Sequence, residues 1–343
     1  MSRPTAVIVL AAGQGTRMKS DLPKVVHPLC GLSLIGHALR AAEGLDPEDV
    51  VAVVRHQRDL VADEISRVCP RALVADQDEI PGTGRAVQCG LSALVDARGP
   101  LTGTVVVTYG DVPLLRSETL AALVDLHEGG GHAVTVLTTR VEDPTGYGRI
   151  IRDADGAVTA IVEQRDATEA QRAITEINAG IYAFDAAFLS DALDRVGSDN
   201  DQGEVYLTDV LAAAAPAGRS AAALELADVW QARGCNDRIQ LAQLGAELNR
   251  RVCRAHMAAG VTVEDPGSTW IDVDVRIARD TTIHPGTCLR GGTTIASWCE
   301  IGPGTTLTDV RVGAGSHLPA TWGESADVPA DTMGAPYAVI DGH

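Results

Sequence analysis

The stretch Ala6-Val7-Ile8-Val9-Leu10-Ala11-Ala12-Gly13-Gln14-Gly15-Thr16-Arg17-Met18 decides how the first part of the chain folds. Its opening run of β-branched and aliphatic residues predicts a strand that is buried on both faces of a parallel sheet. Glycines directly after such a strand let backbone amides approach a phosphate closely, and a helix start after them adds a positive dipole. The stretch therefore predicts a phosphate-binding loop at the edge of an α/β sheet.

Further apolar runs and helical patterns follow this stretch. The runs at 50–54, 105–108 and 133–137 predict three more central strands. Residues 32–43 and 84–95 have helical spacing, and each of these segments is introduced by a turn rich in Gly or Pro. This alternation is typical of an α/β sheet with parallel crossovers.

The end of the chain has a period of six residues. Aliphatic side chains recur at seven positions spaced by six: Ile271, Ile277, Ile283, Leu289, Ile295, Ile301 and Leu307. This period is typical of a parallel β-helix, and seven unbroken matches disfavour the alternative of unrelated strands in a sandwich. We expect the register to slip after Leu307, to end near Leu318 and to fail at Glu324. About three coils would then form, and the Pro-rich residues 329–336 would cap the open end.

A helical pattern joins these two regions. It has one apolar stripe that ends before Gly260, made of Ile239, Leu241, Leu244, Leu248, Val252 and Met257. The sequence therefore predicts three parts: a first domain over 1–228, a linker helix over 229–260, and a short β-helix with a C-terminal cap over 261–343.

Composition narrows the classes of function. The 343 residues carry a formal net charge of −18, which disfavours non-specific binding to nucleic acid or to an anionic membrane. The seven cysteines are scattered and form no zinc-binding pattern, so we expect free thiols in a reducing compartment. The N-terminal residues do not resemble a signal peptide, and no apolar run reaches the ~18 residues of a spanning helix. We expect a cytoplasmic protein.

The glycine loop is not that of the two best-known nucleotide folds. A dinucleotide-binding loop would have a third glycine where Met18 stands and an acidic residue where the second strand ends at Arg55. A Walker loop needs Gly-Lys-Ser/Thr, which the chain lacks. Instead, Arg17 and Lys24 lie on one loop and suit a triphosphate with its pyrophosphate leaving group. The alternative is two solvated surface charges.

A second loop follows the strand at 105–108 and reads Tyr109-Gly110-Asp111-Val112-Pro113-Leu114. It places Asp111 at the carboxyl edge of the sheet, where ligands of open α/β sheets bind. A carboxylate there can hold Mg²⁺ between phosphates, because this ion takes one or two protein oxygens and completes its shell with phosphate and water. The alternative role for Asp111 is that of a helix N-cap.

Eight motifs occur in order between Leu10 and Leu241, within a likeness that covers residues 5 to about 310. They are Leu-Ala-Ala-Gly-x-Gly-Thr-Arg-Met, Asp-Leu-Pro-Lys, Pro-Gly-Thr-Gly-Arg-Ala, Tyr-Gly-Asp-Val-Pro-Leu, Gly-Tyr-Gly-Arg-Ile, Ile-Val-Glu-Gln-Arg-Asp-Ala, Glu-Ile-Asn-Ala-Gly-Ile and Gly-Cys-Asn-Asp-Arg-Ile-Gln-Leu. Together they closely resemble the bifunctional N-acetylglucosamine-1-phosphate uridylyltransferase/glucosamine-1-phosphate acetyltransferase family. The resemblance implies a Rossmann-like, GT-A-like nucleotidyltransferase domain, a linker helix and a short left-handed parallel β-helix of hexapeptide repeats. In that family the first domain joins UTP to N-acetylglucosamine 1-phosphate, and the β-helix acetylates glucosamine 1-phosphate with acetyl-CoA.

The resemblance also implies the site residues. The nucleotide would lie along Leu10, Ala11, Ala12, Gly13, Gly15, Tyr109 and Gly110. Uracil would be recognised by Gln77, Gly82 and Thr83, and Mg²⁺ would be held by Asp111 and Asn236. The sugar would be bound by Gly148, Glu163, Asn178, Tyr206 and Thr208. Arg17 and Lys24 would contact the phosphates and, with Asp111, would be the catalytic residues.

Two departures from the family stand out. Pro81 and Arg85 flank Gly-Thr-Gly where the family usually has Leu and His, which leaves the base selectivity open. From Ile271 onward the chain is short of the coils that carry the acetyl-transfer histidine and the CoA surface, and no histidine here matches that residue. We expect the acetyltransferase activity to be lost.

The sequence thus predicts a Mg²⁺-dependent uridylyltransferase in which the sugar phosphate attacks UTP in line without a protein nucleophile. One alternative is a nucleotidyltransferase for a different sugar 1-phosphate or nucleotide. Another is a non-catalytic relative that only binds a nucleotide sugar. Hexapeptide helices commonly trimerise through their coils, so a homotrimer is a candidate assembly.

Overall fold

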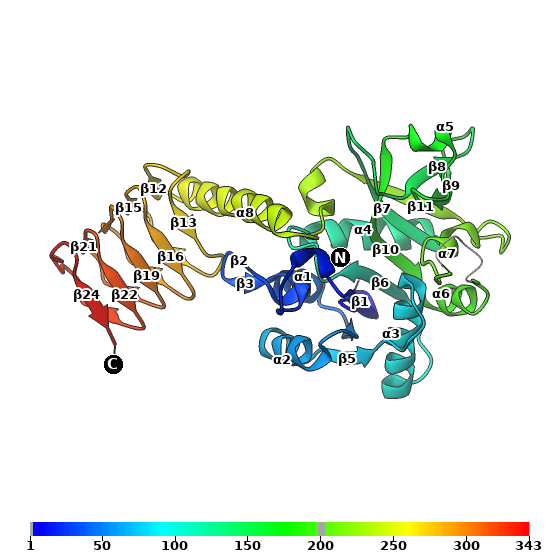
Figure 1. The fold of residues 1–343 in the computed structure, drawn as a ribbon, viewed down its shortest axis with the longest axis horizontal. Coiled ribbons are helices and arrows are strands. Elements are labelled where there is room, and N and C mark those ends of the chain that lie inside the picture. Colours follow the sequence, from blue (N-terminus) through cyan, green and yellow to red (C-terminus); the bar gives the residue numbers. More distant parts are fainter. Residues whose placement is uncertain (1–2, 198–202, 343) are drawn as a thin grey trace. The chain divides into compact units, whose positions relative to one another are not determined.

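The computed structural model describes residues 3–197 and 203–342, and the chain forms two compact units (Figure 1). The first unit contains Met1–His27 and Ser33–Arg238, and the second contains Pro28–Leu32 and Ile239–His343. Apart from the short segment Pro28–Leu32, the boundary between the two units lies between Arg238 and Ile239. The division into domains at 228 and 260 stays a prediction.

The first unit is built on a nine-stranded sheet with the order β11-β7-β10-β6-β1-β4-β5, to which the hairpin β8–β9 is attached. The four predicted strands are confirmed as β1 (Ala6–Leu10), β4 (Asp49–Val54), β6 (Thr104–Tyr109) and β7 (Val134–Arg140). The other strands are β5 (Leu73–Asp76), β8 (Arg149–Arg152), β9 (Val158–Val162), β10 (Glu176–Asp185) and β11 (Ala221–Leu226). β10 runs antiparallel between β6 and β7, so the sheet is mixed and not purely parallel.

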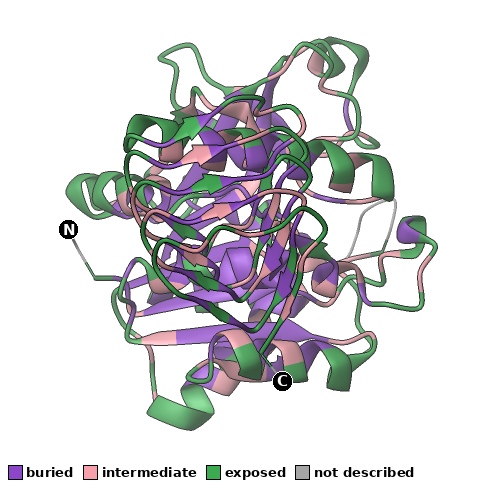
Figure 2. Ribbon diagram, turned by 90° about the vertical axis from the view of Figure 1, so that its left-hand side faces the viewer, coloured by how far each residue is buried: buried purple, intermediate pink, exposed green. Residues whose placement is uncertain are grey.

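Helices cover both faces of this sheet. They are α1 (Leu34–Glu43), α2 (Arg58–Val68), α3 (Thr83–Arg98), α4 (Ser117–Gly130), α5 (Glu169–Arg172), α6 (Ala186–Leu193) and α7 (Asp209–Ala212). Alternate residues of β1 enter two separate cores: Ile8 packs with residues of α3, α6 and α7, and Val9 packs with residues of α1, α2 and α4. Strand β1 is buried along its whole length. Figure 2 shows buried strands, in purple, in the interior of the ribbon. This two-sided burial explains the unbroken apolar sequence of β1.

The second unit is a left-handed parallel β-helix with three parallel sheets, of orders β12-β15-β18-β21, β13-β16-β19-β22-β24 and β14-β17-β20-β23. Its strands are β12 (Thr262–Val263), β13 (Trp270–Ile271), β14 (Arg276–Ile277), β15 (Thr282–Ile283), β16 (Cys288–Arg290), β17 (Thr294–Ile295), β18 (Glu300–Ile301), β19 (Thr306–Thr308), β20 (Arg311–Val312), β21 (His317–Leu318), β22 (Trp322–Glu324), β23 (Asp327–Val328) and β24 (Val339–Asp341). The predicted aliphatic positions pair from coil to coil, for example Ile271 with Leu289 and Leu289 with Leu307. They form the core of the β-helix.

The predicted end of the repeat was wrong. After Leu307 each turn is shorter, so Ile295 pairs with Val312 and Leu307 pairs with Gly323. The inward position is therefore taken by Gly323, and Glu324 points outward and is exposed. The Pro-rich tail does not simply cap the stack, because β24 adds a further strand to β22 beyond it.

The predicted linker helix begins later than expected. α8 spans Arg238–Ala258, whereas Val229–Ala232 form the single 3-10 turn η3 and residues 233–237 form a loop. The expected apolar stripe is only partly buried, since Leu244 is buried and Ile239 is 72% exposed.

Among the described residues, no helix has the length and apolar character needed to cross a membrane. All seven cysteines are free thiols, as expected.

His127 makes the stability of the first unit depend on pH. It lies on α4, is 3% exposed, and its Nδ1 lies 3.0 Å from the hydroxyl of Thr135 on β7. Burial, followed by the nearby charge of His132, lowers the pKa of His127 to about 4. Between pH 6.5 and 4 the unfolded chain therefore binds a proton that the native state does not, so stability falls as the pH falls.

We expect the free energy of unfolding, measured by urea denaturation, to fall from pH 7 to pH 5 by about 2 kcal/mol more in the wild type than in His127→Gln. The comparison uses the slope with pH, so any packing loss in the variant cancels. Equal slopes would show that His127 is protonated in the native state.

Candidate active site

The glycine loop is fixed by backbone bonds between three strand ends. The Ala11 N–H donates to the Val53 carbonyl over 2.8 Å, and the Gly110 N–H donates to the Leu10 carbonyl over 2.9 Å. The loops that follow β1 and β6 are thereby held side by side. At Gly15 the backbone has φ +66°, and a Cβ there would lie 2.5 Å from the Cβ of Lys24. Only glycine lets the loop close onto Lys24.

These loops enclose a pocket of about 370 Å³. The predicted nucleotide residues that line it are Leu10, Ala11, Ala12, Gly13, Lys24, Gln77, Gly82, Thr83 and Tyr109, and the predicted metal ligand Asp111 lines it too. Sequence reasoning missed other lining residues, among them Gln14, Arg55, His56 and Glu204. Arg55 and His56 directly follow β4, which lies next to β1 in the sheet. Their position at the end of a strand beside β1 is the feature that could have predicted them as pocket residues.

Two cations and two oxygen-bearing side chains meet at one side of the loop. The Lys24 ammonium contacts Asp111 Oδ2 in an ion pair, with side chains 13% and 18% exposed. An Arg17 guanidinium N–H donates to Asn236 Oδ1 over 2.9 Å. Asp111 is not the N-cap of α4, because that helix begins at Ser117 and its N-cap is Arg116.

Asn236 reaches this site because its loop is bonded to the Asp111 loop. The Cys235 N–H donates to the Asp111 carbonyl over 2.9 Å, and a Cβ on Gly234 would lie 3.8 Å from the Asp111 carboxyl carbon. The residues between η3 and α8 therefore lie against the carboxyl end of β6. Asp111 and Asn236, which are 125 residues apart in the sequence, become neighbours.

The predicted base-binding residues lie on one ordered loop. Gln77 donates its side-chain amide to the carbonyls of Ile80, over 3.0 Å, and Gly82, over 3.3 Å. Gly82 has φ +119°, and a Cβ there would lie 2.3 Å from the Val205 carbonyl oxygen, so glycine is required. Thr83 begins α3 and accepts a hydrogen bond from the Leu207 N–H over 3.1 Å.

Arg85, the departure noted in this loop, does not line the pocket. Its guanidinium binds both carboxylate oxygens of Asp78. This contact is the main cause that lowers the pKa of Asp78. The charge of Arg85 is therefore engaged outside the pocket in this structure.

Three of the predicted sugar-binding residues come together at the hairpin β8–β9. The Asn178 N–H donates to the Gly148 carbonyl over 2.9 Å. A Cβ on Gly148 would lie 3.1 Å from Glu163 Oε1, so glycine leaves room for this carboxylate. Burial, then the charges of Asp166 and Asp209, raise the pKa of Glu163.

The other predicted residues have different surroundings. Tyr206 and Thr208 are 8% and 6% exposed, in the segment that leads into α7. The predicted residues that do not line the pocket are Gly15, Arg17, Gly110, Gly148, Glu163, Asn178, Tyr206, Thr208 and Asn236. The pocket is therefore lined by most of the predicted nucleotide set, and the predicted sugar set lies outside it.

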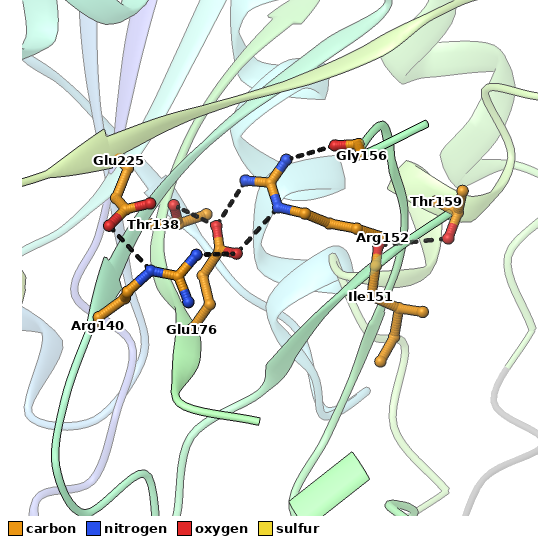
Figure 3. Close-up of polar contacts among 8 residues, drawn as sticks. All are labelled: Thr138, Arg140, Ile151, Arg152, Gly156, Thr159, Glu176 and Glu225. Atoms are coloured by element: carbon orange, nitrogen blue, oxygen red, sulfur yellow. Dashed lines mark hydrogen bonds and ion pairs between the residues drawn. The ribbon is translucent and has the colours of Figure 1, made fainter. Parts of the chain in front are cut away.

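A buried carboxylate holds the hairpin β8–β9 against β10 (Figure 3). Glu176 on β10 is 4% exposed at its side chain and accepts hydrogen bonds from Arg152 on β8, over 2.9 and 2.6 Å. Thr138 donates to it over 2.9 Å and Arg140 over 3.4 Å. Burial alone would raise the pKa of Glu176, but the hydrogen bonds from Arg152 and Thr138 outweigh it and the pKa is lowered. Glu176 stands two residues before Asn178, so this contact also orients the predicted sugar-binding residues.

The fold and this pocket define a nucleotidyltransferase. Residues 7–177 match the family model of the MobA-like NTP transferase domain. The chain is also similar to curated proteins called "Bifunctional protein GlmU": that of Kineococcus radiotolerans is 57% identical over 337 residues, which cover 98% of this chain and 68% of the relative. Those of Streptomyces coelicolor and Mycolicibacterium vanbaalenii are 52% and 53% identical, over 98% of this chain and 70% and 69% of the relatives. The chain belongs to the GlmU family of bifunctional proteins.

We expect Glu176→Gln to lower the free energy of unfolding by about 2 kcal/mol, because it leaves a half-buried guanidinium without its charged partner. It should also speed amide hydrogen exchange in residues 149–162. The matched control is Glu225→Gln, the same change at an exposed partner of Arg140, which should stay within about 0.5 kcal/mol of wild type. Equal effects of the two variants would contradict the assignment of Glu176 as the anchor of the hairpin.

Proposed function

We propose that the protein joins UTP and N-acetylglucosamine 1-phosphate to give UDP-N-acetylglucosamine and pyrophosphate, with the help of Mg²⁺. The observation that carries this proposal is the meeting of Arg17 and Lys24 with Asn236 and Asp111 beside the glycine loop. Cations that neutralise phosphate charge and oxygens that bind a hard metal ion are the two requirements of nucleotidyl transfer.

The reaction needs positioning and charge neutralisation. A phosphate oxygen of the sugar 1-phosphate attacks the α-phosphorus of UTP in line, a new P–O bond forms, and the bond from the α-phosphorus to the bridging oxygen of pyrophosphate breaks. The attacking phosphate is already ionised, so no protein group has to accept its proton or form a covalent intermediate. Arg17 and Lys24 stabilise the charge that builds up on the leaving pyrophosphate.

The donor set fits Mg²⁺. Asp111 supplies a carboxylate and Asn236 supplies an amide oxygen, and each of these oxygens carries a cationic partner in the structure. Among the described residues there is no cluster of three or more His, Cys, Asp or Glu side chains that could enclose a metal ion. This suits a magnesium ion that shares its shell with phosphates and would neutralise their charge when bound.

The sugar would be selected at the hairpin. Gly148, Glu163 and Asn178 lie together, and the Asn178 amide is oriented by its own contacts, with Tyr182 Oη over 2.7 Å and the Gly180 N–H over 2.8 Å. A sugar that left these half-buried polar groups unpaired would bind less well.

A nucleotidyltransferase for a different sugar 1-phosphate or nucleotide is the second candidate, because Pro81 and Arg85 depart from the family pattern in the base-binding loop. Pyrophosphate release from a panel of nucleoside triphosphates and sugar 1-phosphates separates the two, and absence of turnover with every pair would support the non-catalytic relative. The loss of acetyl transfer, the homotrimer and the cytoplasmic location stay predictions.

We expect Asp111→Ala to lower kcat by about a hundredfold or more while the protein still unfolds cooperatively, because Asp111 lines the pocket and belongs to neither apolar core of the first unit. Asp63→Ala, the same change at an exposed position on α2, is the control. Near-normal turnover of Asp111→Ala would remove this carboxylate from the mechanism.

We expect Glu163→Gln to reduce the preference for N-acetylglucosamine 1-phosphate over glucose 1-phosphate by about tenfold, measured as the ratio of kcat/KM values. The KM for UTP should not change, because Glu163 does not line the nucleotide pocket. If wild type uses the two sugar phosphates equally well, the proposed sugar is wrong and the second candidate gains.

A further inference from the structure

We propose that Lys24 is an exchangeable counter-ion: it holds the Asp111 carboxylate in the nucleotide-free protein, excludes a divalent cation from it, and releases it when a triphosphate arrives. This inference rests on the proposed function and concerns the order in which metal and nucleotide enter the site.

The first observation is that the cations and the proposed metal ligands are paired with each other. Lys24 contacts Asp111, and Arg17 contacts Asn236. One oxygen of each proposed metal ligand, Asp111 Oδ2 and Asn236 Oδ1, is thus already in contact with a positive group of the chain itself. A divalent cation that approached Asp111 would be repelled by the ammonium on the same carboxylate.

Burial strengthens this competition. The side chains of Lys24 and Asp111 are only 13% and 18% exposed, so solvent screens their charges less than at the surface. The described part of the chain offers no cluster of carboxylates here that could outweigh the ammonium. Arg17 and Lys24 are two cations beside the single carboxylate of Asp111, so the pair of proposed ligands attracts a metal ion weakly until phosphate charge is added.

The amino-acid usage of the chain points to the same role. Only Lys19 and Lys24 are lysines among the 28 Lys and Arg residues. Arginine serves as the cation almost everywhere else, yet a lysine stands at this one buried ion pair beside the glycine loop. A guanidinium would bind a carboxylate with two parallel hydrogen bonds and would be harder to displace, whereas an ammonium is a compact charge that can exchange partners.

The geometry allows the exchange by movement of the side-chain tip alone. The Cβ of Lys24 is held in place, because the backbone of the loop at Gly15 packs directly on it. Lys24 and Asp111 both line the pocket together with Gly13 of the phosphate loop. The ammonium can therefore leave Asp111 for a phosphate oxygen in the same pocket, which frees the carboxylate for the metal ion that the nucleotide brings. By reciprocity, metal and triphosphate should each tighten the binding of the other.

The test measures Mn²⁺ binding to the nucleotide-free protein, by the loss of the free-ion signal in electron paramagnetic resonance. We expect Lys24→Met to bind Mn²⁺ about tenfold or more tightly than wild type, and the double variant with Asp111→Asn to lose this gain. Lys19→Met is the matched control: it removes the same charge from an exposed residue on the same loop and should leave Mn²⁺ binding close to wild type.

A second measurement follows wild type and does not depend on any variant folding. With ¹³C-labelled lysine, the chain gives Cε–Hε signals from two residues only, and Lys24→Met assigns them. We expect UTP without metal to shift the Lys24 signal strongly and the Lys19 signal much less, because the ammonium changes partners.

The outcomes separate this inference from the proposed function. Unchanged Mn²⁺ binding in Lys24→Met, or a Lys24 signal that saturating UTP does not move, would overturn the counter-ion role even if UDP-sugar formation is normal. If Mn²⁺ binding in the presence of UTP is the same in wild type and Asp111→Asn, the metal site itself is wrong and both proposals lose their basis.

Discussion

The parallel pairing of β1 with β4 and β6 is the constraint on which the candidate site depends. It sets Leu10 opposite Val53 on one side and Tyr109 on the other, so the loops after all three strands leave the sheet at the same edge. The backbone bonds from Ala11 and Gly110 extend this register one step beyond the strands. Without these hydrogen bonds, the positions of the glycine loop and Asp111 relative to each other would not be fixed. The contact between Lys24 and Asp111 depends on the same bonds.

The placement of the proposed sugar-binding residues depends on a different kind of contact. The hairpin β8–β9 meets β10 with a single described ladder pair, between Arg149 and Ile177. Its orientation therefore relies on side chains, above all on the Glu176 carboxylate and Arg152. A buried carboxylate of this kind adds little net stability compared with an apolar pair, but it gives the hairpin one preferred position. The polar network in Figure 3 thus serves the placement of Glu163 and Asn178 more than the strength of the fold.

The pairing of protein cations with proposed metal ligands suggests how an acidic protein can hold a site for a highly charged substrate. The net charge of −18 would repel a free nucleoside triphosphate at long range. Arg17 and Lys24 supply local positive charge at the glycine loop, and their partners Asn236 and Asp111 keep that charge in place before substrate arrives. In the proposed exchange, phosphates replace these partners, so that the site gains ligands for a metal ion and loses none of its cations.

Much of this protein could be predicted from its sequence, because the signals were local or periodic. For the β1 run, the glycine loop and the six-residue repeat, a few neighbouring residues are enough to predict the conformation. The ordered motifs identified the family. The end of the repeat could not be predicted by counting sixes, since the later coils are shorter by one or two residues and place Gly323, not an aliphatic residue, inside. The antiparallel β10 and the late start of α8 also escaped, because packing decides strand direction and helix ends. The family resemblance had already placed Asp111 together with Asn236. What only the tertiary structure decided is the pairing of Lys24 with Asp111, of Arg17 with Asn236 and of Glu176 with Arg152: these contacts join distant segments, and no local preference of the chain encodes them.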